Sequence, residues 1–210
     1  MNKKQRAALI VSGLKELYPL AECSLEAVKD YELLFATRLS AQCTDARVNI
    51  VTGELYSVFP TLPSLAEADI GELERIIFPC GFFHTKAADI KKCANVLIEK
   101  HGGRVPDTME ALLELPGVGR KTANLILGDI YGKPAVVADT HCIRISNRMG
   151  FCDSDNPYKV ELALKDIIEP AEQSDFCHRL VYHGRAVCTA RKAACEACTL
   201  AQWCDYGRSV

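Results

Sequence analysis

Lys121 and Asp139 are the side chains in this sequence best suited to covalent chemistry. Lys121 lies in the run LPGVGRKTA, which spans residues 115–123. A lysine acts as a Schiff-base nucleophile only when its amine is neutral. The start of a helix and the adjacent Arg120 both disfavour a second positive charge there. Asp139 follows in the run VADTH and could stabilise developing positive charge or help deprotonate the lysine. It also fits a simple helix N-cap.

The residues around Lys121 predict two helices joined by a tight turn. Asp107 and Glu110 fit a capping box that opens the first helix, and an apolar face follows in each of the two segments. Gly117 and Gly119 let the chain turn and leave backbone N–H groups uncovered. Such groups at a helix start suit a phosphate oxygen, and contacts of this kind are indifferent to base sequence.

Four of the 11 cysteines form a group near the end of the chain, with the spacing C-x6-C-x2-C-x5-C. They are Cys188, Cys195, Cys198 and Cys204. Structural zinc sites usually combine two close pairs, whereas only one close pair is present here. Four thiolates can instead hold a [4Fe–4S] cluster. The other seven cysteines show no ligand spacing and are assigned to packing or to chance.

Composition is consistent with one compact globule or two small domains, because 49% of the 210 residues are apolar and 25% are charged. No apolar run approaches the length of a membrane helix. The apolar stretch 7–14 follows three basic residues, but Lys15 and Glu16 interrupt it, so we expect an amphipathic surface helix and a reducing compartment.

The charge of the chain is unevenly distributed. The formal net charge is −2, yet residues 115–148 and residues 177–210 each hold five basic against two acidic side chains. The remaining residues therefore carry the excess of negative charge. Such a division allows one positive face to approach phosphate groups while the protein stays soluble.

The apolar pattern is helical nearly throughout and predicts an all-α protein. Residues 85–101 repeat apolar side chains at helical spacing, and the run Ser64–Glu67 fits a capping box before another helix. Only residues 135–138 look strand-like. The helical periodicity breaks at residues 132–134, which is where we expect a seam between domains.

These motifs together resemble the endonuclease III branch of the helix–hairpin–helix DNA glycosylases. Residues 115–123 are similar to the hairpin of that family, with Lys121 at the catalytic lysine. Asp139-Thr140-His141 and the arginines that follow are similar to its catalytic-aspartate segment, and residues 39–45 to an early helix motif. The resemblance runs from about residue 30 to residue 206.

The resemblance implies an all-α, two-domain helix–hairpin–helix glycosylase fold. A six-helix barrel domain is expected over residues 22–133, and an iron–sulfur domain over residues 1–21 plus 134–210. The implied activity is that of a bifunctional DNA N-glycosylase and abasic-site lyase that removes oxidised pyrimidines and cuts by β-elimination. Lys121 and Asp139 are its implied catalytic residues, and a [4Fe–4S] cluster on the four cysteines is its implied cofactor.

The implied partner is double-stranded DNA with damaged bases or abasic sites, bound by a monomer in the cytoplasm or, in a bacterium, at the nucleoid. No membrane association is expected. The implied DNA contacts are Gln42, Phe82, Gly117, Gly119, Arg120, His141, Arg144, Arg191 and Lys192.

Two of these residues, Gln42 and Phe82, are expected to fill the gap left by a flipped-out nucleotide. Phe82 replaces the leucine-like wedge usual at its position, and burial in the core is its other interpretation. Ala138 also departs from the family pattern, which has a bulkier branched residue before the aspartate.

Two alternatives remain open at this point. One is a glycosylase of different specificity, such as an adenine–mismatch enzyme, which the presence of Lys121 disfavours. The other is a non-catalytic binder of DNA damage, or a redox module on the same fold. The combination of Lys121 with Asp139 disfavours this second alternative.

Overall fold

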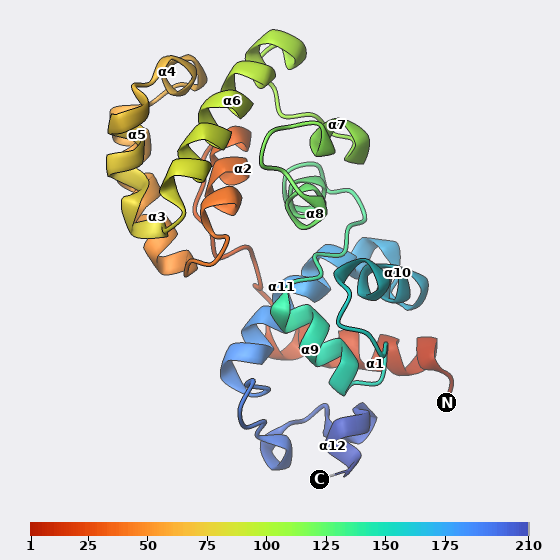
Figure 1. Ribbon diagram of the computed structural model, residues 1–210. Helices are drawn as coiled ribbons and strands as arrows, with labels where there is room; N and C mark the ends of the chain where they lie inside the picture. Colours follow the sequence, from red (N-terminus) through yellow and green to blue (C-terminus); the bar gives the residue numbers. More distant parts are fainter. Residues whose placement is uncertain (210) are drawn as a thin grey trace. The chain divides into compact units, whose positions relative to one another are not determined.

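The computed structural model describes residues 1–209, and this part of the chain divides into two compact units (Figure 1). Residues 23–131 form one unit, called here the continuous unit. Residues 1–22 and 132–209 form the other, the discontinuous unit. No helix within residues 1–209 is long and apolar enough to cross a membrane.

The continuous unit is built from helices around α6 (Phe83–His101), against which α2, α4 and α5 pack (Figure 1). The buried residues of α6 recur every three or four positions, as a helix with one core-facing stripe requires. Gly102 ends the helix with a left-handed backbone, φ +59°. The other elements of this unit are α2 (Asp30–Leu39), α3 (Asp45–Val58), α4 (Leu62–Glu67), α5 (Ile70–Ile77), η1 (Phe78–Cys80), α7 (Met109–Leu113) and α8 (Arg120–Asp129).

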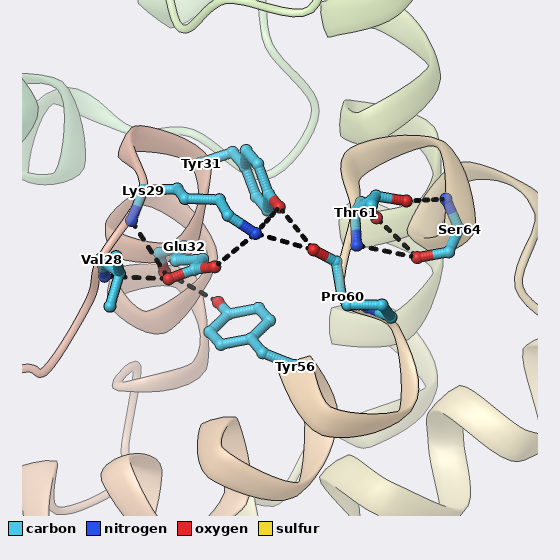
Figure 2. A network of polar contacts seen from close by, with 8 residues as sticks. All are labelled: Val28, Lys29, Tyr31, Glu32, Tyr56, Pro60, Thr61 and Ser64. Carbon is cyan, nitrogen blue, oxygen red and sulfur yellow. Dashed lines mark hydrogen bonds and ion pairs between the residues drawn. The ribbon is translucent and has the colours of Figure 1, made fainter.

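A buried carboxylate fixes the start of α2 (Figure 2). Glu32 Oε2 accepts the backbone N–H groups of Val28 at 2.9 Å and Lys29 at 3.1 Å. The ammonium of Lys29 lies 3.4 Å from Glu32 Oε1 and donates to the carbonyl of Pro60 at 2.7 Å. Tyr56 OH donates to the backbone carbonyl of Glu32 at 2.9 Å. These contacts tie α2 to α3 and to the segment that leads into α4.

Two helix starts expected in this unit differ from those in the structure. Thr61 caps α4 by accepting the N–H of Ser64 at 3.2 Å, and Asp69 caps α5. The expected capping box at Ser64–Glu67 is therefore wrong, because Ser64 already lies inside α4, whose N-cap Thr61 stands three residues earlier. Thr108, not Asp107, caps α7 by accepting the N–H of Ala111.

The discontinuous unit joins the first helix of the chain to the last third of the sequence. Its elements are α1 (Lys3–Leu17), α9 (Thr140–Arg148), α10 (Pro157–Ile167), η2 (Pro170–Glu172), α11 (Gln173–Ala186), η3 (Cys195–Ala197), η4 (Ala201–Trp203) and α12 (Asp205–Ser209). Helix α1 packs against α10, α11 and η4. Its buried Arg6 pairs with Asp205 and donates to the carbonyls of Trp203 and Gly150, each at 3.3 Å.

Residues 135–138 are buried but belong to no β-ladder in the described chain. The N–H of Val137 instead meets Cys177 Sγ on α11 at 3.3 Å. The strand-like pattern therefore reflects burial on all sides rather than sheet formation. This segment leads directly to Asp139.

Candidate functional site

The turn between α7 and α8 is a compact hairpin held by its own backbone. Val118 donates to the carbonyl of Leu115 at 3.1 Å, and Gly117 adopts φ +73°. Leu115 is buried and anchors the turn to the core. Gly119 precedes α8 and offers no side chain to its first N–H groups. Because those groups have no acceptor within the helix, the end of α8 is suited to an external oxygen.

The hairpin faces an ion pair between α2 and α6. Arg38 Nε and Nη2 lie 2.9 and 2.7 Å from Asp89 Oδ2. Both side chains are partly buried, so the pair is better shielded from solvent than a surface pair. The pair lies directly beneath Gly117 and supports the turn from the core side.

Lys121 is an exposed residue in the first turn of α8. The residues after it, from Thr122 to Leu127, are buried and fasten the helix to the continuous unit. The amine therefore projects from a helix whose position is fixed, and it is accessible to a large substrate.

Asp139 is the N-cap of α9. Its Oδ1 accepts the N–H of Cys142 at 2.7 Å, and its own N–H donates to the carbonyl of Val137 at 2.9 Å. The side chain is partly exposed, while Cys142 and residues 135–138 are buried. The carboxylate is thus held by the cap and by a buried backbone on both sides.

His141 and Arg144 lie on the following turn and contact α11 and the cysteine loop. Arg144 Nη2 lies 3.2 Å from His141 Nδ1 and donates to the carbonyl of Cys188 at 3.0 Å. A Cβ on Gly184 would approach His141 Nδ1 to 2.3 Å, so this glycine makes room for the ring. Both side chains are therefore engaged within the discontinuous unit.

Gln42 and Phe82 share an unusual backbone conformation. They are the two non-glycine residues within 1–209 that have positive φ, at +57° and +48°. Gln42 lies in a turn closed by a hydrogen bond from Cys43 N–H to the carbonyl of Ser40 at 3.1 Å. Phe82 precedes α6 and is 66% exposed, so it is not a core aromatic. Positive φ at such residues is uncommon and is often associated with functional sites.

Four cysteines line one cavity in the discontinuous unit. Cys188, Cys195, Cys198 and Cys204 are all free thiols and all partly buried. The rest of the lining is mainly apolar and includes Ile145, Met149, Leu200 and Tyr206. Burial and the neighbouring sulfurs raise the pKa of Cys198 and Cys204. A bound cationic centre would reverse this effect and favour the thiolates.

The chemistry of this donor set fits an iron–sulfur cluster better than one zinc ion. Within residues 1–209, no three His, Cys, Asp or Glu side chains are placed to hold a single metal ion. Four thiols around an apolar cavity instead suit a cluster in which several irons each take one thiolate. Zinc would require all four sulfurs within about 2.3 Å of one point.

Arg148 and His183 support the cysteine cavity from α9 and α11. Arg148 Nη1 lies 3.2 Å from Cys188 Sγ, and the same guanidinium donates to the carbonyls of Thr189 and Ala190 at 2.8 and 3.0 Å. His183 Nε2 lies 3.7 Å from Cys198 Sγ, and its Nδ1 lies 3.2 Å from Tyr18 OH. Burial lowers the pKa of His183 to about 4, so its ring is neutral at neutral pH.

Arg191 and Lys192 occupy an exposed loop between the first two cysteines. An isolated bridge between Cys188 and Ala193 closes the base of this loop. Thr189 Oγ1 also donates to the carbonyl of Lys192 at 2.5 Å. The two cations are therefore carried on a short, internally bonded loop.

Comparison with known proteins identifies the family. Residues 35–170 match the family model described as "HhH-GPD superfamily base excision DNA repair protein". The chain is 46% identical over 209 residues to endonuclease III of Synechocystis sp. (strain ATCC 27184 / PCC 6803 / Kazusa), covering 99% of this chain and 95% of that protein. The chain belongs to the endonuclease III family.

Other members of the endonuclease III family are similar to this protein over the full length of the chain. Endonuclease III of Escherichia coli (strain K12) is 39% identical, with 100% of this chain and 99% of that protein covered. A solved structure described as a trapped endonuclease III–DNA covalent intermediate is 39% identical, with a TM-score of 0.93 and coverage of 100% and 99%. These matches confirm the predicted family and its all-α helix–hairpin–helix fold.

Two residues that support the candidate site were missed by sequence reasoning. Arg148 was noted only as part of a motif, although it contacts a thiol of the cysteine cavity. No sequence motif singles out Lys86, although its ammonium is buried and hydrogen-bonded to three carbonyls. A signal existed for Lys86, because it falls on the buried stripe of α6, four residues before Ile90.

Proposed function

We propose that this protein is a bifunctional DNA N-glycosylase and abasic-site lyase of base-excision repair, acting through Lys121. The match to endonuclease III proteins over the whole chain, at up to 46% identity among those compared, carries the proposal. Lys121, at the start of α8, and Asp139, at the start of α9, are the catalytic residues of this proposal.

DNA binding begins at the hairpin in this proposal. The uncapped N-terminus of α8, with Gly117, Gly119 and Arg120, takes up backbone phosphate. Arg191 and Lys192 contribute further phosphate contacts from the cysteine loop. Contacts of this kind position the protein on a double strand without selecting a sequence. His141 and Arg144 contribute DNA contacts from α9 in this proposal, and Arg144 also holds the loop that bears Cys188.

The damaged nucleotide must leave the stack before it can react. Gln42 and Phe82 are placed in exposed turns with constrained backbones. We assign Gln42 to the orphaned base, because its amide can both donate and accept hydrogen bonds. We assign Phe82 to the stack, because an exposed apolar ring at this position has no partner core to fill.

The reaction then proceeds in three steps. The neutral Nζ of Lys121 attacks C1′, the glycosidic bond breaks, and the base leaves with the bonding electrons. Asp139 stabilises the positive charge that develops on the sugar and helps to remove a proton from the amine. The sugar ring opens to a Schiff base between Nζ and C1′. Loss of a proton from C2′ expels the 3′ phosphate, and water releases the lysine.

The four cysteines, Cys188, Cys195, Cys198 and Cys204, hold a [4Fe–4S] cluster in this proposal, and its contribution is to fix the fold of residues 188–204. The chain itself supplies the support around those ligands. Arg148 anchors Cys188 and its two neighbouring carbonyls, and α1 braces the unit through Arg6.

The remaining assignments follow from the family. The continuous unit corresponds to the six-helix barrel domain and the discontinuous unit to the iron–sulfur domain. The substrate class is oxidised pyrimidines and abasic sites in double-stranded DNA. We further propose a monomer in the cytoplasm, associated with the nucleoid if the source is bacterial.

Borohydride trapping tests the nucleophile. Mixing the protein with a duplex that contains one abasic site, in the presence of borohydride, is expected to yield a covalent adduct. Lys121→Ala should abolish the adduct, whereas Lys100→Ala, which removes an exposed lysine elsewhere in the same unit, should not. Unchanged trapping in Lys121→Ala would rule out this nucleophile.

A lesion panel tests the substrate class. Duplexes that carry oxidised pyrimidines, oxidised purines or an adenine mismatch should be cut in that order of preference. Preferential cutting of the adenine mismatch would contradict the proposed specificity while leaving the lyase chemistry intact.

A further inference from the structure

Lys86 is the most deeply buried charged side chain in the continuous unit, with 1% of its surface exposed. Its ammonium donates to the carbonyls of Leu39 at 2.8 Å, Ala41 at 2.8 Å and Cys80 at 2.9 Å. A lysine ammonium has three donors, so these bonds use all of them. The buried positive charge is therefore stabilised by three backbone carbonyl dipoles.

Each of the three carbonyls belongs to a segment that leads to Gln42 or Phe82. Leu39 ends α2, where carbonyls have no partner within the helix and the helix dipole favours a cation. Ala41 directly precedes Gln42. Cys80 ends η1 and is separated from Phe82 only by Gly81, which has φ +69°.

The backbone of Lys86 holds the Phe82 turn from a second direction. Its N–H donates to the carbonyl of Phe82 at 3.0 Å, in the first turn of α6. Lys86 thus holds the Phe82 turn on both sides, through its ammonium at Cys80 and through its backbone N–H at Phe82. Its ammonium also holds the Gln42 turn at Ala41. Burial lowers the pKa of Lys86, but the three short bonds to carbonyls require the ammonium form.

The same face of α6 also supports the hairpin. Asp89 lies three residues after Lys86, hence on the same side of the helix, and pairs with Arg38 beneath Gly117. One helix therefore connects three loops: the Gln42 turn, the Phe82 turn and the α7–α8 turn.

We propose that Lys86 is a positioning residue that holds the Gln42 and Phe82 turns in one fixed relation, so that both side chains enter a lesion duplex together. The inference rests on the proposed function, in which these two residues are wedges. Lys86 touches no substrate atom and acts through the backbone of the two turns. Both turns carry a non-glycine residue at positive φ, a conformation that the surrounding structure must maintain.

Lys86→Met tests the inference because methionine fills a similar space without any donor. The matched control is Lys91→Met, on the same helix, where the ammonium donates to the carbonyl of Ala68 at 2.6 Å, away from both turns. Both variants are compared with wild type on a duplex that holds an uncleavable abasic-site analogue opposite 2-aminopurine. The fluorescence of 2-aminopurine rises when the base is unstacked.

Lys86→Met is expected to bind the duplex with a Kd within about threefold of wild type, because the hairpin still binds the DNA backbone. The two other measurements are made at saturating protein. The 2-aminopurine signal should fall, and single-turnover cleavage of an abasic duplex should slow about 10- to 100-fold, as for a misplaced positioning group. Lys91→Met should retain both the signal and the rate within about twofold.

A purely structural role would give a different result. Partial unfolding lowers the active fraction of the protein, so the signal and the rate would both recover at saturation. A wild-type signal and rate in saturating Lys86→Met would therefore overturn the inference. If Lys86→Met does not fold, Lys86→Gln, which keeps two donors, should show the same loss of signal to a smaller extent, and its absence would overturn the inference as well. Failure of wild type itself to trap on an abasic duplex would instead contradict the proposed function.

Discussion

The Asp89 carboxylate fills the space that a side chain at Gly117 would need. A Cβ built on Gly117 would lie 2.7 Å from Asp89 Oδ2 and 2.9 Å from Arg38 Nε. Gly117 also has φ +73°, whereas Gly119, two residues later, has φ −99° and open space around its Cβ position. The two glycines of the hairpin therefore serve different purposes.

This difference predicts effects of alanine on stability that differ in size at the two positions. Gly117→Ala should destabilise the protein by about 2 kcal/mol or more, since a left-handed alanine costs roughly 1–2 kcal/mol before the contact with Asp89 is counted. Gly119→Ala should cost about 1 kcal/mol or less, because only a modest N-cap preference is lost. Urea unfolding of both variants measures the effect, and equal losses would contradict it.

Asp139 combines a helix cap with a proposed catalytic charge, and two substitutions separate them. Asp139→Ala should lower the free energy of unfolding by about 1 kcal/mol, as loss of an N-cap does. Asp139→Asn should keep that stability within about 0.5 kcal/mol, because asparagine caps helices as well as aspartate. Both should slow single-turnover cleavage about 10²-fold or more, since neither retains the carboxylate. Full activity in Asp139→Asn would limit Asp139 to a structural role.

The buried thiol of Cys93 predicts a loss of stability at alkaline pH. Burial raises its pKa from 9.0 to about 12, so the thiol stays protonated in the folded protein where the unfolded chain ionises. The unfolded state then binds fewer protons, and stability falls as pH rises above about 9. Between pH 7.5 and pH 10 one such thiol lowers the free energy of unfolding by about 1.4 kcal/mol. Comparison of urea unfolding at pH 7.5 and pH 10 should show a smaller decrease in Cys93→Ala than in wild type, and an equal decrease would contradict the assignment.

The contacts of Arg148 predict that cluster binding by the four cysteines depends on this side chain. Arg148→Met removes the donor to Cys188 Sγ and the bonds to two carbonyls of the same loop, so the purified variant should carry less iron than wild type. Mutation of a group that contacts a metal ligand typically lowers metal affinity about 10- to 100-fold. Arg208→Met, which removes an exposed cation on α12, is the control. Iron analysis and visible absorbance measure the outcome, with about four irons per chain expected for wild type.

Sequence patterns anticipated the parts of the fold that depend on local spacing. The hairpin follows from its glycines and the flanking apolar stripes, and the cysteine group from its ligand spacing. Helix starts were less accessible, because Thr61 and Ser64 are both good caps and only the extended backbone of Thr61 decides between them. The segment before Asp139 has a strand-like pattern because burial on all sides and sheet formation produce the same apolar run.

Long-range contacts explain what sequence patterns could not supply. The carbonyls that Lys86 binds come from residues up to 47 positions away, and the loop that Arg148 holds lies about 40 positions away. A cation that binds backbone carbonyls leaves no complementary side chain in the sequence to reveal its partner. Such residues become visible only when a charged side chain falls on a buried helix stripe.

The loop cations Arg191 and Lys192 give a prediction that separates backbone contacts from chemistry. Each phosphate contact releases counterions, so the logarithm of the binding constant falls with the logarithm of salt concentration by about 0.9 per contact on duplex DNA. Replacement of both residues by alanine should reduce that slope by about 2 and weaken binding to undamaged and abasic duplexes alike, because such contacts carry no sequence or lesion information. Lys159→Ala, an exposed lysine on α10, should leave the slope unchanged. A double variant with the wild-type slope would place this loop away from the DNA, whereas a defect restricted to abasic duplexes would indicate contact with the lesion itself.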